Sequence, residues 1–407
     1  MPPAAPPPLA PTKPKPQHWD IQRAVRKNIL ALAPYRCARD DYDQGILLDA
    51  NENALGHALP AANGDSSVTD TSFDDLDLHR YPSPTHYDVK QRLCELRGVP
   101  SPHNFFLGVG SDEVIDLLFR IACVPGRDRA LVCPPTYGMY SVCAQVNDVE
   151  IVKVDLDVEG GKFRPKVDEI NRTLSAAAKS DNPIKLIYLC SPGNPTGTLI
   201  PLDDVRAILA NPDYEGLVVV DEAYIDFASR DKSAVELLVN EGWSNLVIMQ
   251  TLSKGFGLAA IRLGIAISSP ELIQVLNNIK APYNISTPTA SLALRALSPQ
   301  GLSAFRQNIS TLLSNRSYLA SALLSLPSII ALPGAGDANF LLAQVAGRDG
   351  RPDNARAKEV YTHMAERDRV VVRFRGNEVG CEACLRITVG TRDECERVVE
   401  RLRELLQ

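Results

Sequence analysis

The residues best suited to chemistry lie in a stretch that runs Thr251-Leu-Ser-Lys254-Gly-Phe-Gly and continues to Arg262. Lys254 follows strand-like residues and has small neighbours, so its amine can be drawn partly out of water. Desolvation lowers the pKa of a lysine and makes the amine nucleophilic. Thr251 and Ser253 supply hydroxyl donors, and Arg262 supplies a planar fork that matches a phosphate monoester. The stretch predicts a site for an aldehyde bearing a phosphate, held by Lys254 as a Schiff base; taken alone, a surface lysine beside a turn is the alternative.

Two further motifs follow strand-like runs and favour the first interpretation. Asp221-Glu-Ala-Tyr224 ends the run LVVVD, and Ser191-Pro-Gly-Asn194-Pro-Thr-Gly follows LIYLC. A buried carboxylate at Asp221 can pair with a protonated pyridine nitrogen and keep that ring cationic. Tyr224 and Asn194 can bond the oxygen of the same ring. A helix cap at Asp221 and a plain Asn-Pro turn are the structural alternatives.

A third motif, Gly108-Val-Gly110-Ser111-Asp112-Glu, opens a helical run. A helix N-terminus binds phosphate through its free N–H groups and its dipole, although a capping box explains Ser111 and Asp112 almost as well. Tyr137 ends Pro134-Pro-Thr-Tyr137 and either stacks on a cofactor ring or fills the core.

Two arginines near the C-terminus stand inside strand-like runs, Arg373 in VVVRF and Arg386 in CLRITVGT. A charge inside a strand is costly unless it is paired. A structural ion pair is one interpretation for each, and we favour an anion-binding role for both.

The elements that must position these residues alternate between strands and helices from about Tyr81 onward. Such alternation predicts an α/β fold around a mostly parallel sheet with helices on both faces. The predicted strands are 130–133, 151–154, 186–190, 217–220, 246–250 and 263–268, and the predicted helices include 112–123, 203–209 and 270–279.

The rest of the chain predicts a smaller α+β domain and an N-terminal extension. After Pro288 a long helical stretch at 289–325 leads to strands at 329–332, 339–344, 370–374 and 385–389 and to a helix at 391–406. We expect a disordered proline-rich leader (1–20), a segment that packs with the small domain (21–78, with a helix at 21–32), a large cofactor-binding domain (79–288) and a small C-terminal domain (289–407).

Composition narrows the classes of function. The 407 residues carry a formal net charge of −6, which argues against a nucleic-acid binder. No apolar run is long enough for a membrane span. Nine scattered cysteines suit a reducing compartment, and the cytoplasm is the expected location. The lone CxxC at Cys381 and Cys384 lacks a second pair, so we expect ordinary thiols and no metal.

The motifs, taken together, resemble those of the fold-type I, class II aminotransferases, which depend on pyridoxal 5′-phosphate. The resemblance is most specific to the histidinol-phosphate aminotransferase family and runs from about Pro34 to the end. The stretches that carry it are RYPSP, GVGSDE, CPPTYGMYSV, SPGNPTG, DEAYIDF, TLSKGFGLAAIRLG, APYNISTP and CLRITVGT.

The resemblance implies a role for each matched residue. Lys254 would hold the cofactor and move the proton, Asp221 would bind the pyridine nitrogen, and Tyr224 and Asn194 the ring oxygen. The cofactor phosphate would be surrounded by Ser111, Asp112, Thr251, Ser253 and Arg262. Tyr81 would reach that phosphate from the other subunit of a homodimer with shared active sites. The substrate anion would be bound by Arg386, with Arg373, Tyr35, Asn194 and Tyr283.

The implied reaction exchanges an amino group between L-histidinol phosphate and 2-oxoglutarate, giving imidazole-acetol phosphate and glutamate in histidine biosynthesis. Two enzymatic alternatives are transfer from aromatic amino acids and decarboxylation of a phosphorylated amino acid. A non-catalytic regulator built on the same fold is a remote third, because the segment before Ile21 is too short to be a DNA-binding module.

Overall fold

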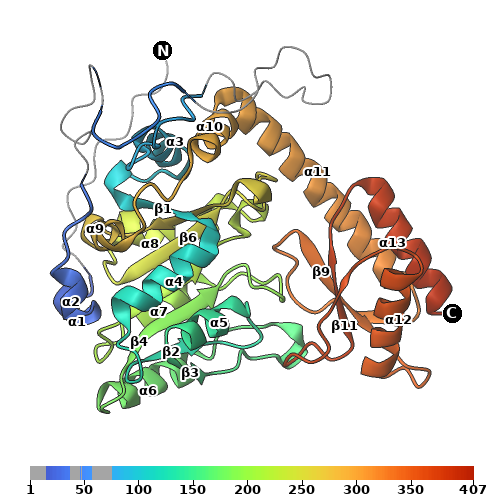
Figure 1. The fold of residues 1–407 in the computed structure, drawn as a ribbon. Coiled ribbons are helices and arrows are strands. Elements are labelled where there is room, and N and C mark those ends of the chain that lie inside the picture. The colour runs from blue at the N-terminus through green and yellow to red at the C-terminus, as the bar shows by residue number, and fades with distance from the viewer. Residues whose placement is uncertain (1–14, 37–45, 47, 57–75) are drawn as a thin grey trace, which may run out of the picture.

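The computed structural model describes residues 15–36, 46, 48–56 and 76–407. These residues form a large α/β domain and a smaller α+β domain, joined by one long helix (Figure 1). The α/β class expected from the alternating pattern is confirmed.

The large domain is built on a seven-stranded sheet with the order β1-β7-β6-β5-β4-β2-β3. Only β7 runs antiparallel to its neighbours β1 and β6, and the remaining pairs are parallel. All six strands predicted for this region are present, within two residues at each end. Strand β1 was not predicted from the sequence. The strands are β1 (Phe105–Val109), β2 (Arg129–Val132), β3 (Glu150–Lys153), β4 (Ile184–Cys190), β5 (Leu217–Asp221), β6 (Leu246–Thr251) and β7 (Leu263–Ile267).

Helices cover both faces of this sheet, as the apolar strands require. One face packs against α1 (Ile21–Ala24), α2 (Lys27–Leu30), α4 (Gly110–Ala122), α5 (Met139–Val146) and α9 (Pro270–Ile279). The other packs against α3 (Tyr87–Arg97), α6 (Val167–Ala178), α7 (Leu202–Leu209), α8 (Val235–Glu241) and α10 (Thr287–Ala296). Strand β5 is buried along its whole length, which explains its unbroken apolar run.

The small domain has a four-stranded antiparallel sheet with the order β10-β11-β9-β8. Its core lies between this sheet and the helices that cover it (Figure 1). The elements are α11 (Pro299–Leu324), β8 (Ile329–Ala331), β9 (Phe340–Val345), α12 (Asn354–Glu366), β10 (Arg373–Phe374), β11 (Cys384–Thr388) and α13 (Arg392–Leu405).

Three expectations about the organisation of the chain are wrong. The expected helix over 21–32 is two short helices, and their buried residues Ala24, Val25 and Ile29 pack in the large domain, not the small one. The leader is ordered from Lys15, whose backbone pairs with the chain at Trp243 through hydrogen bonds to Gly242 and Ser244. Residues 1–14 lie outside the described part.

The chain also crosses between the domains later than expected. The expected single helix over 289–325 breaks at Ser298, whose side chain caps α11 ahead of Pro299. Helix α10 packs in the large domain through Ala293, so the crossing to the small domain is made by α11 (Figure 1).

Candidate active site

A cavity of about 470 Å³ lies at the carboxyl edge of the parallel strands, facing the small domain. Parallel strands end at one edge of their sheet, so the polar residues after β4, β5 and β6 meet there. Lys254 enters it from the turn after β6, with its Nζ 5.7 Å from the ring centre of Tyr224. Partial burial, followed by the charges of Arg386 and Arg262, lowers the pKa of Lys254. The lysine therefore has the environment expected of a nucleophilic amine.

Asp221 is the deepest carboxylate of the cavity and is only 3% exposed. Tyr140 Oη donates to its Oδ2 at 2.6 Å, and the Ala223 N–H donates to Oδ1 at 3.1 Å. Burial raises the pKa of Asp221, while these two donors and the nearby Lys254 act in the opposite direction. A carboxylate held this way is stabilised by a cationic partner, such as a protonated ring nitrogen, at the open side of the cavity.

The N-terminus of α4 forms an anion cradle at the other end of the cavity. Ser111 Oγ is buried and has no hydrogen-bond partner among the described residues. Gly110 has φ +73°, and a Cβ there would collide with the Arg262 guanidinium. Gly264 lies against the Gly110 backbone, where a Cβ would also collide, so β7 brings Arg262 up to the helix N-terminus. The unsatisfied hydroxyl, the helix dipole and the guanidinium fit a phosphate group.

Four more of the predicted residues surround this cradle. Arg262 Nη2 lies 3.4 Å from Asp112 Oδ2, and Tyr137 Oη donates to Asp112 Oδ1 at 3.2 Å. Thr251 Oγ1 donates to the Leu263 carbonyl at 2.9 Å, and it also accepts from the Ser253 N–H. The structure thus brings Ser111, Asp112, Tyr137, Thr251, Ser253 and Arg262 together around one end of the cavity.

The opposite wall comes from the small domain. Arg386 on β11 donates through Nη1 to Asn194 Oδ1, and its guanidinium lies 5.3 Å from the ring centre of Phe340. The Tyr224 ring meets Phe340 edge-on at 5.2 Å. Burial lowers the pKa of Arg386, and the charge of Arg375 contributes next. Both domains therefore contribute to the site: Asn194 and Tyr224 of the large domain contact Arg386 and Phe340 of the small domain.

Three guanidinium groups share one face of the small-domain sheet. Arg373 pairs directly with Arg386 in the register of β10 and β11, and the Arg375 N–H donates to the Cys384 carbonyl at 2.8 Å. All three arginines line the cavity. Arg375 is also bonded to Glu378 at 2.7 Å. Arg375 was not predicted from the sequence, although its spacing of two residues from Arg373 places both side chains on one face of an extended segment.

Tyr140 was also missed. It stands three residues after Tyr137, and the two rings meet edge to face with their centres 5.6 Å apart. Nothing in its own sequence context distinguishes it from a core tyrosine, because its role depends on the distant Asp221.

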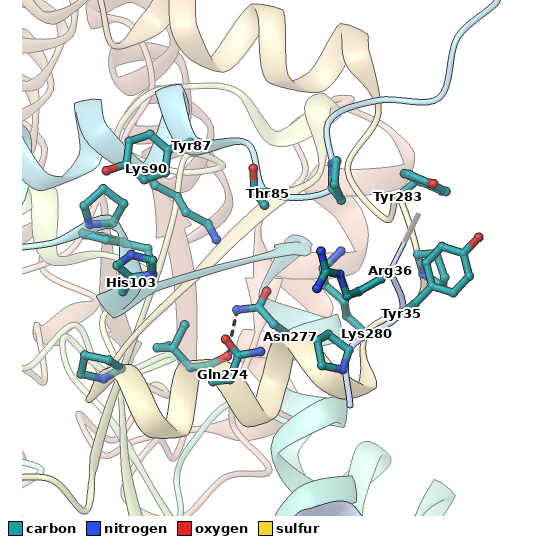
Figure 2. A pocket seen from close by; sticks show the side chains of 17 residues that line it. Tyr35, Arg36, Thr85, Tyr87, Lys90, His103, Gln274, Asn277, Lys280 and Tyr283 are labelled. Carbon is teal, nitrogen blue, oxygen red and sulfur yellow. Dashed lines mark hydrogen bonds between the residues drawn. The ribbon is translucent and has the colours of Figure 1, made fainter. Parts of the chain in front are cut away.

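Three predicted residues do not line the cavity around Lys254 in this single chain. Tyr81 stacks on Tyr283 with ring centres 4.7 Å apart, and Tyr35 meets Tyr283 edge-on at 6.1 Å. Figure 2 shows Tyr35 and Tyr283 at the margin of a separate pocket. Tyr81 is 54% exposed and Tyr35 is 63% exposed, so both rings are available to another surface.

The described residues offer neither a metal site nor a membrane-spanning helix. Residues 15–36, 46, 48–56 and 76–407 contain no cluster of three or more histidine, cysteine or acidic side chains that could hold a metal. No helix in the same ranges has the length and apolarity needed to cross a bilayer.

Comparison with known proteins places these features in a family context. Residues 43–402 match the family model for aminotransferase class I and II. The histidinol-phosphate aminotransferase of Schizosaccharomyces pombe is 47% identical over 398 residues, covering 96% of this chain and 98% of the relative. That of Saccharomyces cerevisiae is 42% identical over 401 residues, covering 95% and 98%.

Solved structures share the fold at lower identity. The histidinol-phosphate aminotransferase of Sinorhizobium meliloti, in complex with pyridoxal 5′-phosphate, aligns with a TM-score of 0.70 at 24% identity and covers 88% of this chain and 89% of that one. The protein of the same name from Clostridium acetobutylicum aligns with a TM-score of 0.68 at 19% identity and covers 81% and 91%.

Proposed function

The chain belongs to the histidinol-phosphate aminotransferase family within the class I and II aminotransferases, and on that premise we propose the reaction and the residues that perform it. The enzyme transfers an amino group between L-histidinol phosphate and 2-oxoglutarate, giving imidazole-acetol phosphate and glutamate. The observation that carries the residue assignments is the single cavity that joins Lys254, the buried Asp221 and the α4 cradle to the arginines of the small domain.

The enzyme uses pyridoxal 5′-phosphate, which supplies an aldehyde that condenses with amines and a ring that accepts negative charge. Its phosphate fits the Ser111 hydroxyl, the α4 N-terminus and Arg262, with Thr251, Ser253 and Asp112 around them. Asp221 would hold the ring nitrogen. Tyr224 and Asn194 would bond the ring oxygen, and Tyr137 would contact the ring.

Lys254 has two tasks in this proposal. Its Nζ would hold the aldehyde carbon of the cofactor until a substrate amine takes its place. The free Nζ amine would then accept the proton from the substrate carbon that bears nitrogen and later return it, so one side chain would act as base and as acid. The lowered pKa of Lys254 keeps its amine available as a base. A ping-pong scheme follows, since one substrate must leave before the other enters.

The arginines at the small-domain wall bind the anionic group of the substrate. Histidinol phosphate carries a dianionic phosphate where glutamate carries a carboxylate, and guanidinium forks accept both. Arg386 is the principal contact, and Arg373 and Arg375 share its face of the sheet.

We expect Arg386→Ala to reduce kcat/KM about 100-fold for both histidinol phosphate and glutamate, because it removes charge-assisted hydrogen bonds of roughly 3 kcal/mol. Single-turnover absorbance of each half-reaction measures this effect. Arg386→Lys is the control that keeps the charge and loses the fork, so its loss should be smaller. Normal turnover of both substrates by Arg386→Ala would refute the assignment.

We also propose a homodimer in which Tyr81 reaches the cofactor phosphate of the partner subunit. The exposed Tyr81–Tyr283 stack, away from the Lys254 cavity of its own chain, supports this arrangement. Tyr35 and Tyr283 belong to the substrate site in this proposal, because Tyr283 packs against both Tyr81 and Tyr35.

Mixing Tyr81→Ala with Lys254→Ala should restore activity, because each mixed dimer has one intact site. Random reassociation gives about a quarter of the parental site concentration. Steady-state assay after unfolding and refolding the mixture tests this. The matched control mixes Asp221→Asn with Lys254→Ala, whose residues share one chain's cavity, and should restore nothing. If the two mixtures had the same activity after refolding, active sites shared between subunits would be excluded.

The experiment that tests the overall function separates keto product from carbon dioxide. Histidinol phosphate and 2-oxoglutarate should give glutamate in equal amount to the ketone, and threonine phosphate or tyrosine should be poor substrates. Carbon dioxide release from a phosphorylated amino acid would favour a decarboxylase instead.

We place the reaction in the cytoplasm. The eight cysteines of the described residues are free thiols, which suits a reducing compartment.

A further inference from the structure

The backbone that carries Lys254 lies directly against a carboxylate outside the cavity. The residue after Lys254 is a glycine, and a Cβ at Gly255 would lie 2.6 Å from both Cβ and Oδ2 of Asp226. Any larger residue at position 255 would therefore collide with Asp226. Asp226 does not line the cavity around Lys254, and the proposed amino transfer gives it no role.

Asp226 is itself held by a different part of the chain. It belongs to the 3-10 turn Ile225–Phe227 (η4), which directly follows Tyr224, and its side chain is 4% exposed. Arg97, the last residue of α3, donates through Nη1 to Asp226 Oδ1 at 2.7 Å, and its side chain is 13% exposed. The buried ion pair thus ties η4 to α3 at the point where Asp226 meets the Lys254 turn.

This ion pair is poorly suited to stabilising the fold. Nε and Nη2 of Arg97 are buried and have no hydrogen-bond partner among the described residues. A buried ion pair with unsatisfied donors contributes little to stability, because the desolvation of both charges offsets their attraction. Two well-packed apolar side chains would serve folding as well. What the pair does provide is a fixed orientation of Asp226 against Gly255.

A second contact holds the same turn. The Phe256 ring stacks on the Phe305 ring of α11, with ring centres 4.0 Å apart and planes 9° apart. Gly255 and Phe256 are the two residues that follow Lys254, so both are fixed by segments distant in the sequence. The lysine side chain therefore starts from a backbone that has little freedom to shift.

Asp226 acts on Lys254 through contact and not through its charge. Burial, and then the charge of Arg386, lower the pKa of Lys254, and Asp226 is not among the groups that shift it. Tyr224 lies two residues before Asp226, and its ring centre is 5.7 Å from Lys254 Nζ. The packing of Asp226 on Gly255 therefore sets the separation of two side chains that would meet on the same cofactor.

We propose that Asp226, oriented by Arg97, is a positioning residue that fixes Lys254 relative to Tyr224 by packing against Gly255. This inference rests on the proposed role of Lys254 as anchor and base. Misplacement of a reacting group by about 1 Å can cost roughly 100-fold in rate, so a rigid support behind the turn affects catalysis directly.

The test replaces both members of the pair at once, so that no unpaired charge stays buried. In the cofactor-loaded protein with Arg97→Met and Asp226→Ala, which removes the support behind Gly255, the limiting rate of the half-reaction with histidinol phosphate should fall at least about tenfold. The half-saturating concentration should change less than about twofold, because substrate contacts are untouched. An unchanged limiting rate, with or without weaker binding of substrate, would overturn the proposal.

A matched variant separates contact from charge. Arg97→Met with Asp226→Asn also removes the ion pair but keeps a side chain of the same size against Gly255, so its loss of rate should be clearly smaller. A loss as large as that of the alanine double variant would mean that the charge of Asp226 acts on the site, and would overturn positioning by contact.

A second measurement needs no substrate. Full-length protein stripped of cofactor is mixed with pyridoxal 5′-phosphate, and the absorbance change that accompanies covalent joining to Lys254 is followed in time. Joining should be at least about fivefold slower in the alanine double variant than in the parent. The rate reports on Lys254 alone, so it stays informative if histidinol phosphate proves not to be the substrate. Joining at the parental rate would overturn the proposal.

Melting temperatures and a control ion pair separate position from folding. Arg164 and Asp204 form a bidentate pair of the large domain that lies outside the cavity lining. Arg164→Met with Asp204→Asn should keep the parental rates. If it loses as much rate as the alanine double variant for the same fall in melting temperature, the effect is one of folding and the proposal fails. If the alanine double variant does not fold, Gly255→Ala replaces it, because its Cβ pushes the turn away from Asp226; parental rates in that variant would equally overturn the proposal.

Discussion

Replacing Lys254 by alanine should lower the rate of amino transfer by about four orders of magnitude, the upper range for loss of a positioned acid–base group. The side chain is both the covalent anchor and the base in the proposed reaction, and among the described residues Lys254 is the only lysine that lines the cavity. Single-turnover absorbance with histidinol phosphate measures the loss directly.

The controls for this prediction separate chemistry from folding. Lys254→Arg keeps the charge but removes the nucleophile, so it should be as impaired as the alanine variant. An added small amine such as methylamine should restore part of the rate in Lys254→Ala, because that variant leaves room for it. Turnover of Lys254→Ala at the parental rate would end the assignment of this residue.

The sequence predicted the centre of the site well because its residues follow strands. Asp221, Asn194 and Lys254 each come after an apolar run, and parallel strands bring such positions to one edge of the sheet. The helix that begins at Gly110 was predicted from its own glycine and serine start and the helical run that follows. These inferences needed only the alternation of elements and the residue type at each turn.

What the sequence could not supply depends on contacts between distant segments. Tyr140 matters because it donates to Asp221, which is 81 residues away. The N-terminal helices have the apolar spacing of any surface helix, and only packing shows that Ala24 belongs to the large domain. Strand β1 was also missed; it pairs with β7, which lies far along the chain.

Replacing Asp221 by asparagine should reduce kcat by about 10² to 10⁴, the range that corresponds to losing one partner of a buried ion pair, roughly 3–5 kcal/mol. Asparagine keeps the size of the side chain but cannot hold a proton on a ring nitrogen. The measurement is the rate of each half-reaction at saturating substrate. A rate within a factor of two of the parent would show that the buried carboxylate has no part in the chemistry.

Tyr140→Phe should perturb Asp221 less than Asp221→Asn does, and the direction of the change in its pKa follows from the lost hydrogen bond. The Tyr140 hydroxyl donates to Asp221 and so lowers the pKa of that carboxyl against the rise caused by burial. Without the hydroxyl the pKa of Asp221 rises further, and the carboxylate is protonated at higher pH. The acid limb of the pH–rate profile should therefore move to higher pH in Tyr140→Phe, with a loss of about tenfold at low pH. An acid limb that stays in place, or moves to lower pH, would mean that Tyr140 acts only as a packing residue.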